Sequence, residues 1–407
     1  MTPATQAAAS LYEYYGRQRL LPTFANLGDE AAVAAYEQGR ERLFSDRLGL
    51  PVRVFAGARV LEFGSDTGEN ALCFARWGAQ MTIVEPNERA HEAVRHYFER
   101  YAPPGRLEGI VSADVLGFSG ERIYDAIVAE GFIYTVRPTR AWLDAFAALV
   151  QDGGLVVVSY YERHGALIEL AMKALYQGAR RIAGRPGDET ARRLFSAKWD
   201  SIPHTRTFES WTMDVLENPF VRTRWFIDAR ELLEEADAAG FDLYSSWPVY
   251  RDPLEIAWHK APLDRARRLA GARGHVERSV LGYVCGESAF LTGGPAAVAA
   301  LSARIDEALD AIDATMDAET RYREAAEALE RLDAALLEAP LLGDRNAACS
   351  EEGRARARRL IACLREGFSA LARGDVETVE NMTRANPAFI AGWGLPAHFA
   401  AFRRRAE

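Results

Sequence analysis

The sequence predicts an α/β fold in which a mostly parallel sheet is joined to a C-terminal helical domain. Residues 58–162 alternate short apolar runs with helical stretches, which is the pattern of βαβ units around a parallel sheet. From about residue 294 the chain is rich in Ala, Leu, Glu and Arg with a helical period. The 407 residues are also too many for one ordinary core, so we expect more than one domain.

Apolar runs in the first of these regions predict the parallel strands. A proline near the first turn marks a helix over residues 138–150. Two further β-like runs follow at 241–247 and 255–260, and the short connection between them favours antiparallel pairing. The predicted parallel strands are residues 58–63, 80–85, 107–112, 124–129 and 155–160, with the turn Asp152-Gly153-Gly154 before the last of them.

The texture of the sequence predicts three regions. Residues 1–57 form an N-terminal helical cap, residues 58–262 a ligand-binding sheet domain, and residues 263–407 a C-terminal helical domain whose Gly-bearing first part, 263–294, resembles a linker. The sheet domain contains an insertion, residues 163–226, that is irregular, aromatic and rich in arginine. This insertion is too long to be a simple connection, so we expect it to be a lid over the substrate.

Composition and charge exclude several classes of protein. The net charge of −9 argues against broad binding of a phosphate backbone, and the clusters Arg180-Arg181, Arg192-Arg193 and Arg403 to Arg405 are expected to be solvated faces. No apolar run reaches the roughly 20 residues of a membrane helix, and the first residues do not have the pattern of a secretory signal. The four scattered cysteines suit a reducing cytoplasm, and no metal-binding cluster is visible.

A glycine loop follows the first predicted strand. The strand runs into Gly64-Ser65-Asp66-Thr67-Gly68, and a helix begins directly after it. Gly64 allows a tight turn, and Gly68 lets the helix approach the backbone closely. The loop lacks the middle glycine of a complete G-x-G-x-x-G, so on its own it does not identify the ligand.

Three acidic residues narrow the choice of ligand. Glu62 lies at the end of the first strand, where it favours a cationic group and would repel a pyrophosphate. Glu85 ends the second strand, where a carboxylate accepts both hydroxyls of a ribose, and Asp114 follows the third, where it can meet an adenine amino group. A ligand that is nucleoside, sulfonium and amino acid together is S-adenosylmethionine. The alternatives are a helix N-terminal acid for Glu85, a turn residue for Asp114 and a local cap of the loop amides for Glu62.

The segment ARVLEFGSDTGENALCFARWGAQMTIVEPN resembles the first motif and the acidic second strand of class I S-adenosylmethionine-dependent methyltransferases. SADV, YDAIVAEGFIYTV and FDLYSSWPVYRDPLEIAWHK resemble later parts of the same plan, over about residues 50–262. The resemblance implies a Rossmann-like, mostly parallel seven-stranded sheet with a reversed last strand. It also implies which residues surround the donor. Its methionine end would lie against Glu62, Gly64, Ser65 (a glycine in many members) and Gly68, and its ribose against Glu85 and Pro86. Its adenine would lie against Asp114 and Val115, with Glu130 and Gly131 under the sulfonium and Tyr14 and Arg17 over the donor.

Candidates for the acceptor site come from the ends of strands four and five and from the insertion. His204 is the first candidate for a general base, because imidazole titrates near neutral pH, and His164 is the second. For His204 the alternative is a surface or structural histidine, for Trp211 it is a helix that packs Trp211 and Leu216 inward, and for Tyr14 it is core packing. The other candidates are Asp214 as a catalytic residue and Tyr134, Tyr160, Tyr161, Arg206 and Trp211 as substrate-binding residues.

The sequence therefore predicts a cytoplasmic, S-adenosylmethionine-dependent methyltransferase without a metal. The expected acceptor is an oxygen or nitrogen of a small polar molecule in a bacterial biosynthetic pathway, for a specialised metabolite or a surface sugar. The C-terminal helices are expected to form a homodimer interface. The alternatives are a peptide or protein methyltransferase that uses the helical domain for docking, and a non-catalytic scaffold that binds S-adenosylmethionine. A dinucleotide oxidoreductase is disfavoured by Glu62 and the missing glycine.

Overall fold

The structure of the chain is a computed structural model. The residues that it describes are 10–18, 27–203, 207–251, 263–286, 289–292, 294–318, 321–339 and 347–406. They divide into two compact units, each with its own core. The sheet unit comprises residues 1–160, 230–272 and 398–407, and the helical unit comprises residues 161–229 and 273–397.

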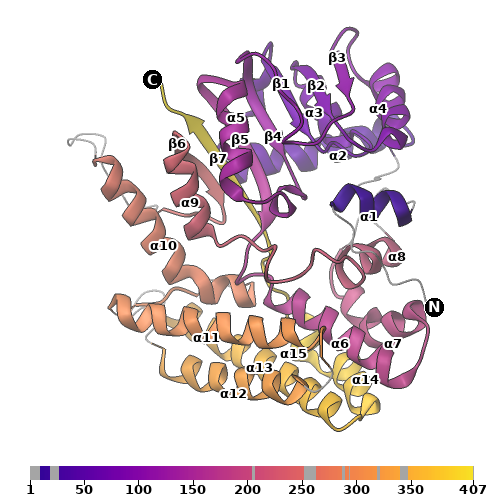
Figure 1. Cartoon of the computed structure of the whole chain (residues 1–407), viewed down its shortest axis with the longest axis vertical. Helices are drawn as coiled ribbons and strands as arrows, with labels where there is room; N and C mark the ends of the chain where they lie inside the picture. The colour runs from indigo at the N-terminus through magenta and orange to yellow at the C-terminus, as the bar shows by residue number, and fades with distance from the viewer. Residues whose placement is uncertain are drawn as a thin grey trace. The chain divides into compact units, whose positions relative to one another are not determined.

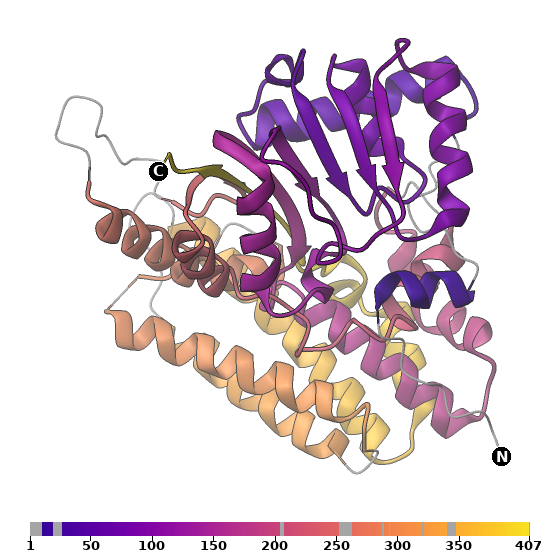
Figure 2. The same ribbon diagram turned by 45° about the horizontal axis from the view of Figure 1, so that its top comes forward.

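The sheet unit contains a seven-stranded sheet with the order β3-β2-β1-β4-β5-β7-β6. β1 to β5 are parallel to their neighbours within that group, and β6 and β7 pair antiparallel. Figure 2 shows the first strands side by side with their arrowheads in one direction. The strands are β1 Arg59–Phe63, β2 Gln80–Val84, β3 Leu107–Val111, β4 Tyr124–Ala129, β5 Val150–Tyr161, β6 Phe241–Trp247 and β7 Ala397–Arg404.

Helices cover both faces of this sheet because alternate strand residues are apolar on both sides. Val60 belongs to the core shared with the helices α2, α3 and α4, whereas the ring of Phe63 stacks on Phe146 of α5 at 5.2 Å between centroids. The helices and short turns of the unit are α1 Leu11–Gln18, α2 Glu30–Glu41, η1 Arg42–Arg47, η2 Val52–Phe55, α3 Glu69–Arg76, α4 Glu88–Tyr101, η3 Ile133–Thr135, α5 Thr139–Leu149 and α9 Ala229–Ala238.

The helical unit is a bundle whose apolar faces form one continuous core. α11, α12 and α13 pack side by side (Figure 1). Among residues the structure describes, no helix is long and apolar enough to cross a membrane. The elements are α6 Leu167–Ala183, α7 Gly187–Trp199, α8 Phe208–Trp211, η4 Thr212–Leu216, α11 Pro295–Ala314, α12 Tyr322–Glu338, α13 Ala347–Ala372, α14 Val376–Ala385 and α15 Pro387–Ala391, with α10 Arg265–Cys285 shared between the units.

The predicted reversed strand is present, but a different segment supplies it. The run 255–260 lies outside the described residues, and the strand between β5 and β6 is β7, from the end of the chain. Its sequence AHFAAFRR alternates only weakly, so local pattern does not distinguish it from the helices before it. The last residues therefore belong to the sheet unit and not to the predicted C-terminal domain.

Three further expectations about local structure were wrong. Asp152-Gly153-Gly154 is not a turn before β5 but an irregularity within it, where the pairing moves from Val150 to Leu155. The insertion 163–226 is largely helical and not irregular, because runs such as Leu167–Ala183 bury an apolar face in the core of the helical unit. The linker-like stretch 263–294 likewise contains the helix α10.

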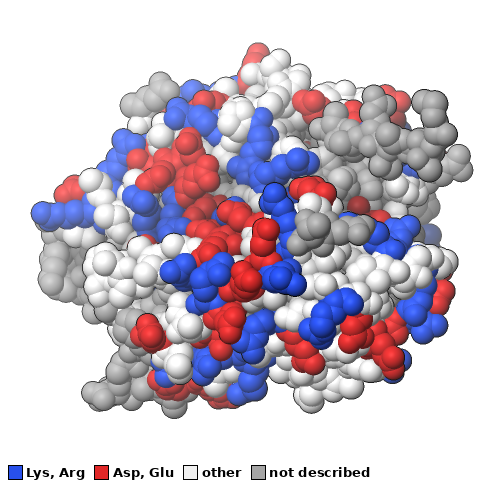
Figure 3. All heavy atoms as spheres, turned by 60° about the horizontal axis from the view of Figure 1, so that its bottom comes forward, with Lys and Arg blue, Asp and Glu red and all other residues white. Residues whose placement is uncertain are grey.

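The surface carries both signs of charge. On the face drawn in Figure 3, acidic and basic side chains are interspersed. Many of them form ion pairs along helices, such as Arg193 with Glu189 and Arg304 with Glu307. This pattern is that of a solvated surface and differs from the basic field that phosphate-backbone binding requires.

Candidate functional site

The central strands end in register with one another, so their carboxyl ends lie at the same edge of the sheet. Phe63 of β1 pairs with Val84 of β2 and with Ala129 of β4. The next residues along the chain, Gly64, Glu85 and Glu130, are therefore brought to the same edge of the sheet. In open α/β sheets, ligands bind at this edge.

Two glycines shape the loop between β1 and α3. Gly64 has a φ of +65°, and a Cβ there would come within 2.4 Å of the Phe132 ring. Gly68 has a φ of +88°, precedes the first turn of α3, and would place a Cβ 3.0 Å from Val94 Cγ2. Ser65, between them, is buried. The loop therefore holds its backbone close to its neighbours, as a ligand-binding turn requires.

Replacing Gly64 by alanine tests this close approach, with Gly57→Ala as the control. Both glycines have a positive φ, which costs alanine about 1–2 kcal/mol, but nothing lies within 4 Å of a Cβ at Gly57. Gly64→Ala must also displace Phe132, so we expect it to lower the free energy of unfolding by about 1–3 kcal/mol more than the control. If urea titrations show the same loss of unfolding free energy for both variants, the close approach of Phe132 to Gly64 does not affect stability.

Glu85 is buried directly after β2 and is held by the backbone. Its carboxylate oxygens accept hydrogen bonds from Asp66 N at 2.9 Å and from Asn87 N at 2.8 Å. Burial raises the pKa of Glu85 to about 7, and these two backbone bonds oppose the rise. Each carboxylate oxygen still has a lone pair for a further donor, so the group is fixed in place and able to bind hydroxyls.

A second acidic group lies beside an arginine that the sequence analysis did not predict. Arg40 of α2 forms a bidentate ion pair with Glu130, with distances of 2.8 and 2.6 Å. Glu62 is 1% exposed, and its Oε2 has no hydrogen-bond partner among the described residues. Burial, and next to it the charge of Glu130, raises the pKa of Glu62 to about 8, while Arg40 opposes this. The cluster thus offers one cation and two carboxylates at the edge of the sheet.

Arg40 could have been recognised from its helical spacing. Val33, Tyr36, Arg40 and Phe44 follow one another at the spacing of a single helix face, so the arginine is directed toward the sheet. Tyr36 donates a hydrogen bond to Asn70 Oδ1 at 2.8 Å, and the Arg40 guanidinium lies 5.1 Å from the centre of the Phe44 ring. An arginine on an otherwise apolar face is the available signal.

The remaining residues of the predicted donor site are those at the adenine, at the ribose and under the sulfonium. Asp114 is exposed, and its Oδ1 accepts a hydrogen bond from Gly117 N at 2.6 Å, which is the turn role given as its alternative. Val115 is buried and Pro86 is half-buried. Gly131 is exposed and its N–H donates to Ser159 Oγ at 2.8 Å.

The first helix lies near the start of α4. Arg89 of α4 donates a hydrogen bond to the carbonyl of Gly16 in α1 at 3.3 Å, and α4 begins shortly after Glu85. Tyr14 is buried, whereas Arg17 is exposed and pairs with Glu13. This places α1 at the same edge as the acidic residues.

A comparison with protein families identifies the family of this chain. A family model described as a methyltransferase domain matches residues 34–246, more than half of the chain. The chain belongs to the methyltransferase family. The predicted resemblance is thereby confirmed, and with it S-adenosylmethionine as the cofactor.

Solved structures with the same kind of fold resemble the methyltransferase only distantly. The N-methyltransferase NodS from Bradyrhizobium japonicum WM9, in complex with S-adenosyl-L-homocysteine, is 20% identical, over 37% of this chain and 74% of that one, with a TM-score of 0.29. The cyclase SpnF is 13% identical over 93% and 82%, with a TM-score of 0.36. A protein that converts a disulfide bond into a thioacetal during echinomycin biosynthesis is 21% identical over 53% and 69%, with a TM-score of 0.31. A comparison with curated protein sequences finds no match.

Two tyrosines predicted to bind the acceptor are internal in this methyltransferase. Tyr134 and Tyr160 are 1% and 2% exposed. The Tyr160 hydroxyl forms a hydrogen bond with that of Tyr250, which in turn bonds His398 Nδ1 at 2.7 Å. Both side chains are therefore part of the core, which the sequence analysis did not anticipate.

The remaining predicted residues that the structure describes belong to the helical unit. Tyr161 stacks on Phe226, and Asp214 is half-buried on η4. Trp211 is 4% exposed and packs among Phe195, Trp199 and Phe208, so it fits the packing alternative. His204 and Arg206 lie outside the described residues.

His164 does not have the surroundings of a general base. It is fully buried, with Nδ1 3.0 Å from Glu162 Oε1 and Nε2 3.8 Å from Asp306 Oδ1. Burial alone would lower the pKa of His164, but the carboxylates of Glu162 and Asp306 raise it to about 10. An imidazole that keeps its proton at neutral pH cannot accept another, so these surroundings are those of a buried cation beside two carboxylates and not of a base.

This assignment predicts a pH dependence of stability. The pKa of His164 is about 10 in the folded protein and 6.5 when unperturbed. Its stabilisation is therefore complete below pH 6.5 and is lost as the pH rises toward 10. We expect the loss of stability caused by His164→Gln, measured by urea unfolding, to be larger below pH 6.5 than near pH 10.

Burial also lowers the pKa values of Lys173 and Lys198 to about 7, so their titration changes the stability with pH in the opposite direction. Each variant is therefore compared with the wild type at the same pH, which cancels the contribution of the two lysines. The control is His96→Gln, because His96 is exposed on α4. A loss at His164 that does not change with pH would contradict a buried imidazolium.

Proposed function

We propose that this methyltransferase transfers the methyl group of S-adenosylmethionine to an oxygen or nitrogen of a small polar molecule in a bacterial biosynthetic pathway, for a specialised metabolite or a surface sugar. The observation that supports the choice of donor is that Gly64, Glu85 and Glu130 lie at the same edge of the sheet, with the buried Glu62 beside them. The bound donor supplies a methyl group that is already activated on a sulfonium. The chain has only to bind, align and shield the reactants, and in some cases to remove a proton.

The residues present fit the donor by charge. Glu62 has a buried oxygen without a hydrogen-bond partner in the part of the chain that the structure describes, which suits an ammonium group, and Arg40 suits a carboxylate. Glu85 would hold the ribose hydroxyls. The other assignments are those implied by the family: Gly64, Ser65 and Gly68 at the methionine end, Pro86 at the ribose, Asp114 and Val115 at the adenine, Glu130 and Gly131 near the sulfonium, and Tyr14 and Arg17 as a cover.

On the acceptor side, we propose His204 as the base, with Arg206, Asp214 and Tyr161 as the polar and aromatic contacts. Tyr134, Tyr160 and Trp211 remain further candidates for binding the acceptor, although each of them is buried. We further propose that the enzyme works in the cytoplasm and forms homodimers through its C-terminal helices.

Calorimetry with three ligands tests the donor assignment. We expect S-adenosylmethionine and S-adenosylhomocysteine to bind and NAD to give no signal. An anionic pyrophosphate would lie next to Glu62, so tight binding of NAD without a response to the other two would overturn the proposal.

The raised pKa of Glu62 predicts proton release when the donor binds. With a pKa of about 8, the Glu62 carboxyl holds most of a proton at neutral pH. A cation placed beside it favours the ionised form, so that proton should leave on binding. Calorimetry in buffers with different ionisation enthalpies measures the release, and we expect Glu62→Gln to release less than the wild type. Equal release from both proteins would show that Glu62 does not face the donor.

A further inference from the structure

The end of the chain carries an arginine cluster that methyl transfer does not use. In the sequence, Arg403 to Arg405 are expected to be a solvated face, but the structure joins this cluster to arginines from two other segments around the strand β6. We call this set the β6 basic rim. Its members are Arg251, Arg265, Arg268, Arg403 and Arg405, together with Asp237 and Asp242.

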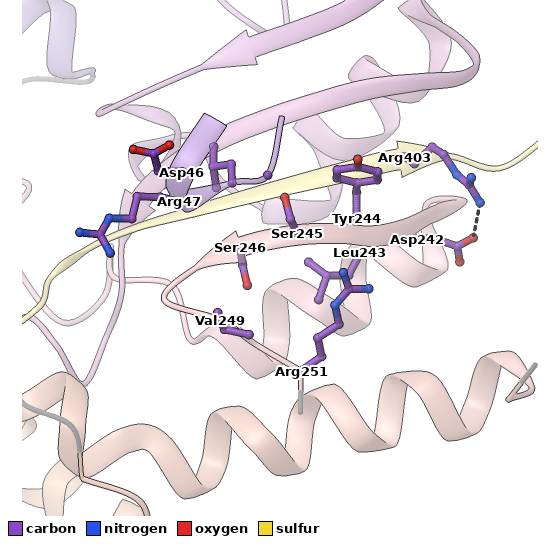
Figure 4. A pocket seen from close by; sticks show the side chains of 12 residues that line it. Asp46, Arg47, Asp242, Leu243, Tyr244, Ser245, Ser246, Val249, Arg251 and Arg403 are labelled. Carbon is purple, nitrogen blue, oxygen red and sulfur yellow. Dashed lines mark ion pairs between the residues drawn. The ribbon is translucent and has the colours of Figure 1, made fainter. Parts of the chain in front are cut away.

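The basic rim borders a hollow that follows β6. The hollow has a volume of about 540 Å³ and touches five consecutive residues of the strand, 242–246, so it runs along the strand (Figure 4). Arg251 and Arg403 line it as well. A smaller hollow shares Asp242 and Arg251 with it and is lined also by Arg265 and Arg268.

The hollow involves the last two strands of the sheet, because it is lined by residues of β6 and by Arg403 of β7. β6 is the last strand in the sheet order, and no other strand in the described part of the chain pairs with its outer edge. An edge of this kind presents backbone N–H and C=O groups that can pair with another chain. Ser245 Oγ is buried and has no hydrogen-bond partner among the described residues. β6 therefore has unused hydrogen-bonding capacity beside the hollow.

The charges of the rim are not balanced. Asp242 is shared among Arg405 at 3.1 Å, Arg268 at 3.8 Å and Arg403 at 4.0 Å. The Arg403 side chain is 57% exposed (Figure 4 shows it reaching toward Asp242), and Arg251 forms no ion pair within the described residues.

The second carboxylate does not restore the balance. Asp237 is shared between Arg265 at 2.5 Å and Arg405 at 3.2 Å. Asp46 and Arg47, which also line the hollow, cancel each other in charge. Four arginines thus share two aspartates and Arg251 has neither, which among the described residues is a local excess of positive charge in a chain whose net charge is −9.

We propose that the outer edge of β6 binds an extended acidic peptide segment of a protein partner. The segment would pair with β6 as an added strand, with its backbone on the free edge and its carboxylates on Arg251 and Arg403. Backbone pairing would supply affinity, and the arginines would select acidic side chains. This interaction is separate from methyl transfer and does not depend on it.

A nucleic acid fits this surface less well than a peptide. The carboxylates of Asp237 and Asp242 act equally on a phosphate and on an acidic side chain, so charge alone does not separate the two ligands. A free strand edge, however, matches the alternating donors and acceptors of a peptide, which a sugar-phosphate backbone does not offer.

The experiment uses the full chain and a synthetic peptide of alternating valine and glutamate, about six residues long, with a valine–lysine peptide of the same length as its control. We expect the acidic peptide to bind in fluorescence anisotropy and the basic one not to bind. Arg251→Ala combined with Arg403→Ala should weaken binding about ten-fold or more, and more salt should weaken it further. Arg304→Ala, an exposed arginine of the helical unit, should leave the affinity unchanged.

Hydrogen exchange of the β6 amides tests the mode of binding. Strand addition should slow the exchange of amides in residues 241–247 when the peptide is bound. Absence of binding, equal binding by the double variant, or binding without amide protection would overturn the proposal. Tighter binding of an oligouridylate than of the acidic peptide would overturn it in favour of a nucleic acid. Self-association of the wild type that the double variant abolishes would overturn it in favour of a second copy of the chain.

Discussion

Replacing Arg40 by alanine is expected to lower the free energy of unfolding by about 3–5 kcal/mol and to abolish donor binding. The guanidinium is 11% exposed and holds Glu130, which is 7% exposed, in a bidentate pair. Removing it leaves the carboxylate of Glu130 buried without a cation and also removes the positive charge that lowers the pKa of Glu62. Urea unfolding measures the first effect, and calorimetry with S-adenosylhomocysteine measures the second.

Two further variants show whether charge is the cause. Arg42→Ala, at an exposed position just after α2, should change stability by no more than about 0.5 kcal/mol. The double variant Arg40→Met with Glu130→Gln should recover part of the lost stability, because it removes the uncompensated charge of Glu130, but should not recover donor binding. If Arg40→Ala is as mild as Arg42→Ala, the buried ion pair does not stabilise this edge of the sheet.

Replacing Glu85 by alanine is expected to weaken donor binding about 10- to 150-fold, the equivalent of a charged hydrogen bond of about 1.5–3 kcal/mol. The carboxylate is 4% exposed and already fixed by Asp66 N and Asn87 N, so little conformational freedom remains to be lost when the ribose binds. The measurement is the Kd of S-adenosylmethionine and of S-adenosylhomocysteine, which share the ribose.

The matched control for Glu85 is Glu88→Ala. Glu88 lies in the first turn of α4 and is exposed, so its removal should leave the Kd unchanged. Glu85→Gln, which keeps an oxygen acceptor, should fall between the wild type and Glu85→Ala. An unchanged Kd in a folded Glu85→Ala variant would remove this residue from the donor site.

The sheet and its acidic edge could be predicted because their signals are local. Each parallel strand is a short apolar run, and Glu85 and Glu130 each come directly after such a run. Once parallel strands are inferred, their carboxyl ends must meet at one edge, and the structure has them level.

The last strand and the arginine of the cluster could not be predicted in the same way. More than a hundred residues of mostly helical sequence separate β6 from β7, which pair with each other. The sequence pattern of β7 does not show which strand it pairs with. The helical spacing of Arg40 with Val33 and Phe44 indicates that it faces the sheet, but only the structure shows that it pairs with Glu130. In both cases the deciding information is a contact between distant parts of the chain.

His164 shows the limit of reasoning from residue type. The ordinary pKa of imidazole suggests a base, but the sequence does not reveal that Glu162 and Asp306 both face the ring in a buried site. The nature of the neighbours, and not of the residue, determines its protonation. Trp211 is similar, because an aromatic side chain serves a substrate or a core equally well, and here it packs with Phe195 and Trp199.

The most direct test of the donor assignment is a crystal structure of the complex with S-adenosylhomocysteine. The result we expect has the ribose hydroxyls on Glu85, the ammonium group next to Glu62 and the carboxylate on Arg40. A complex in which the ligand lies away from the ends of β1, β2 and β4, with those three side chains unchanged, would contradict it.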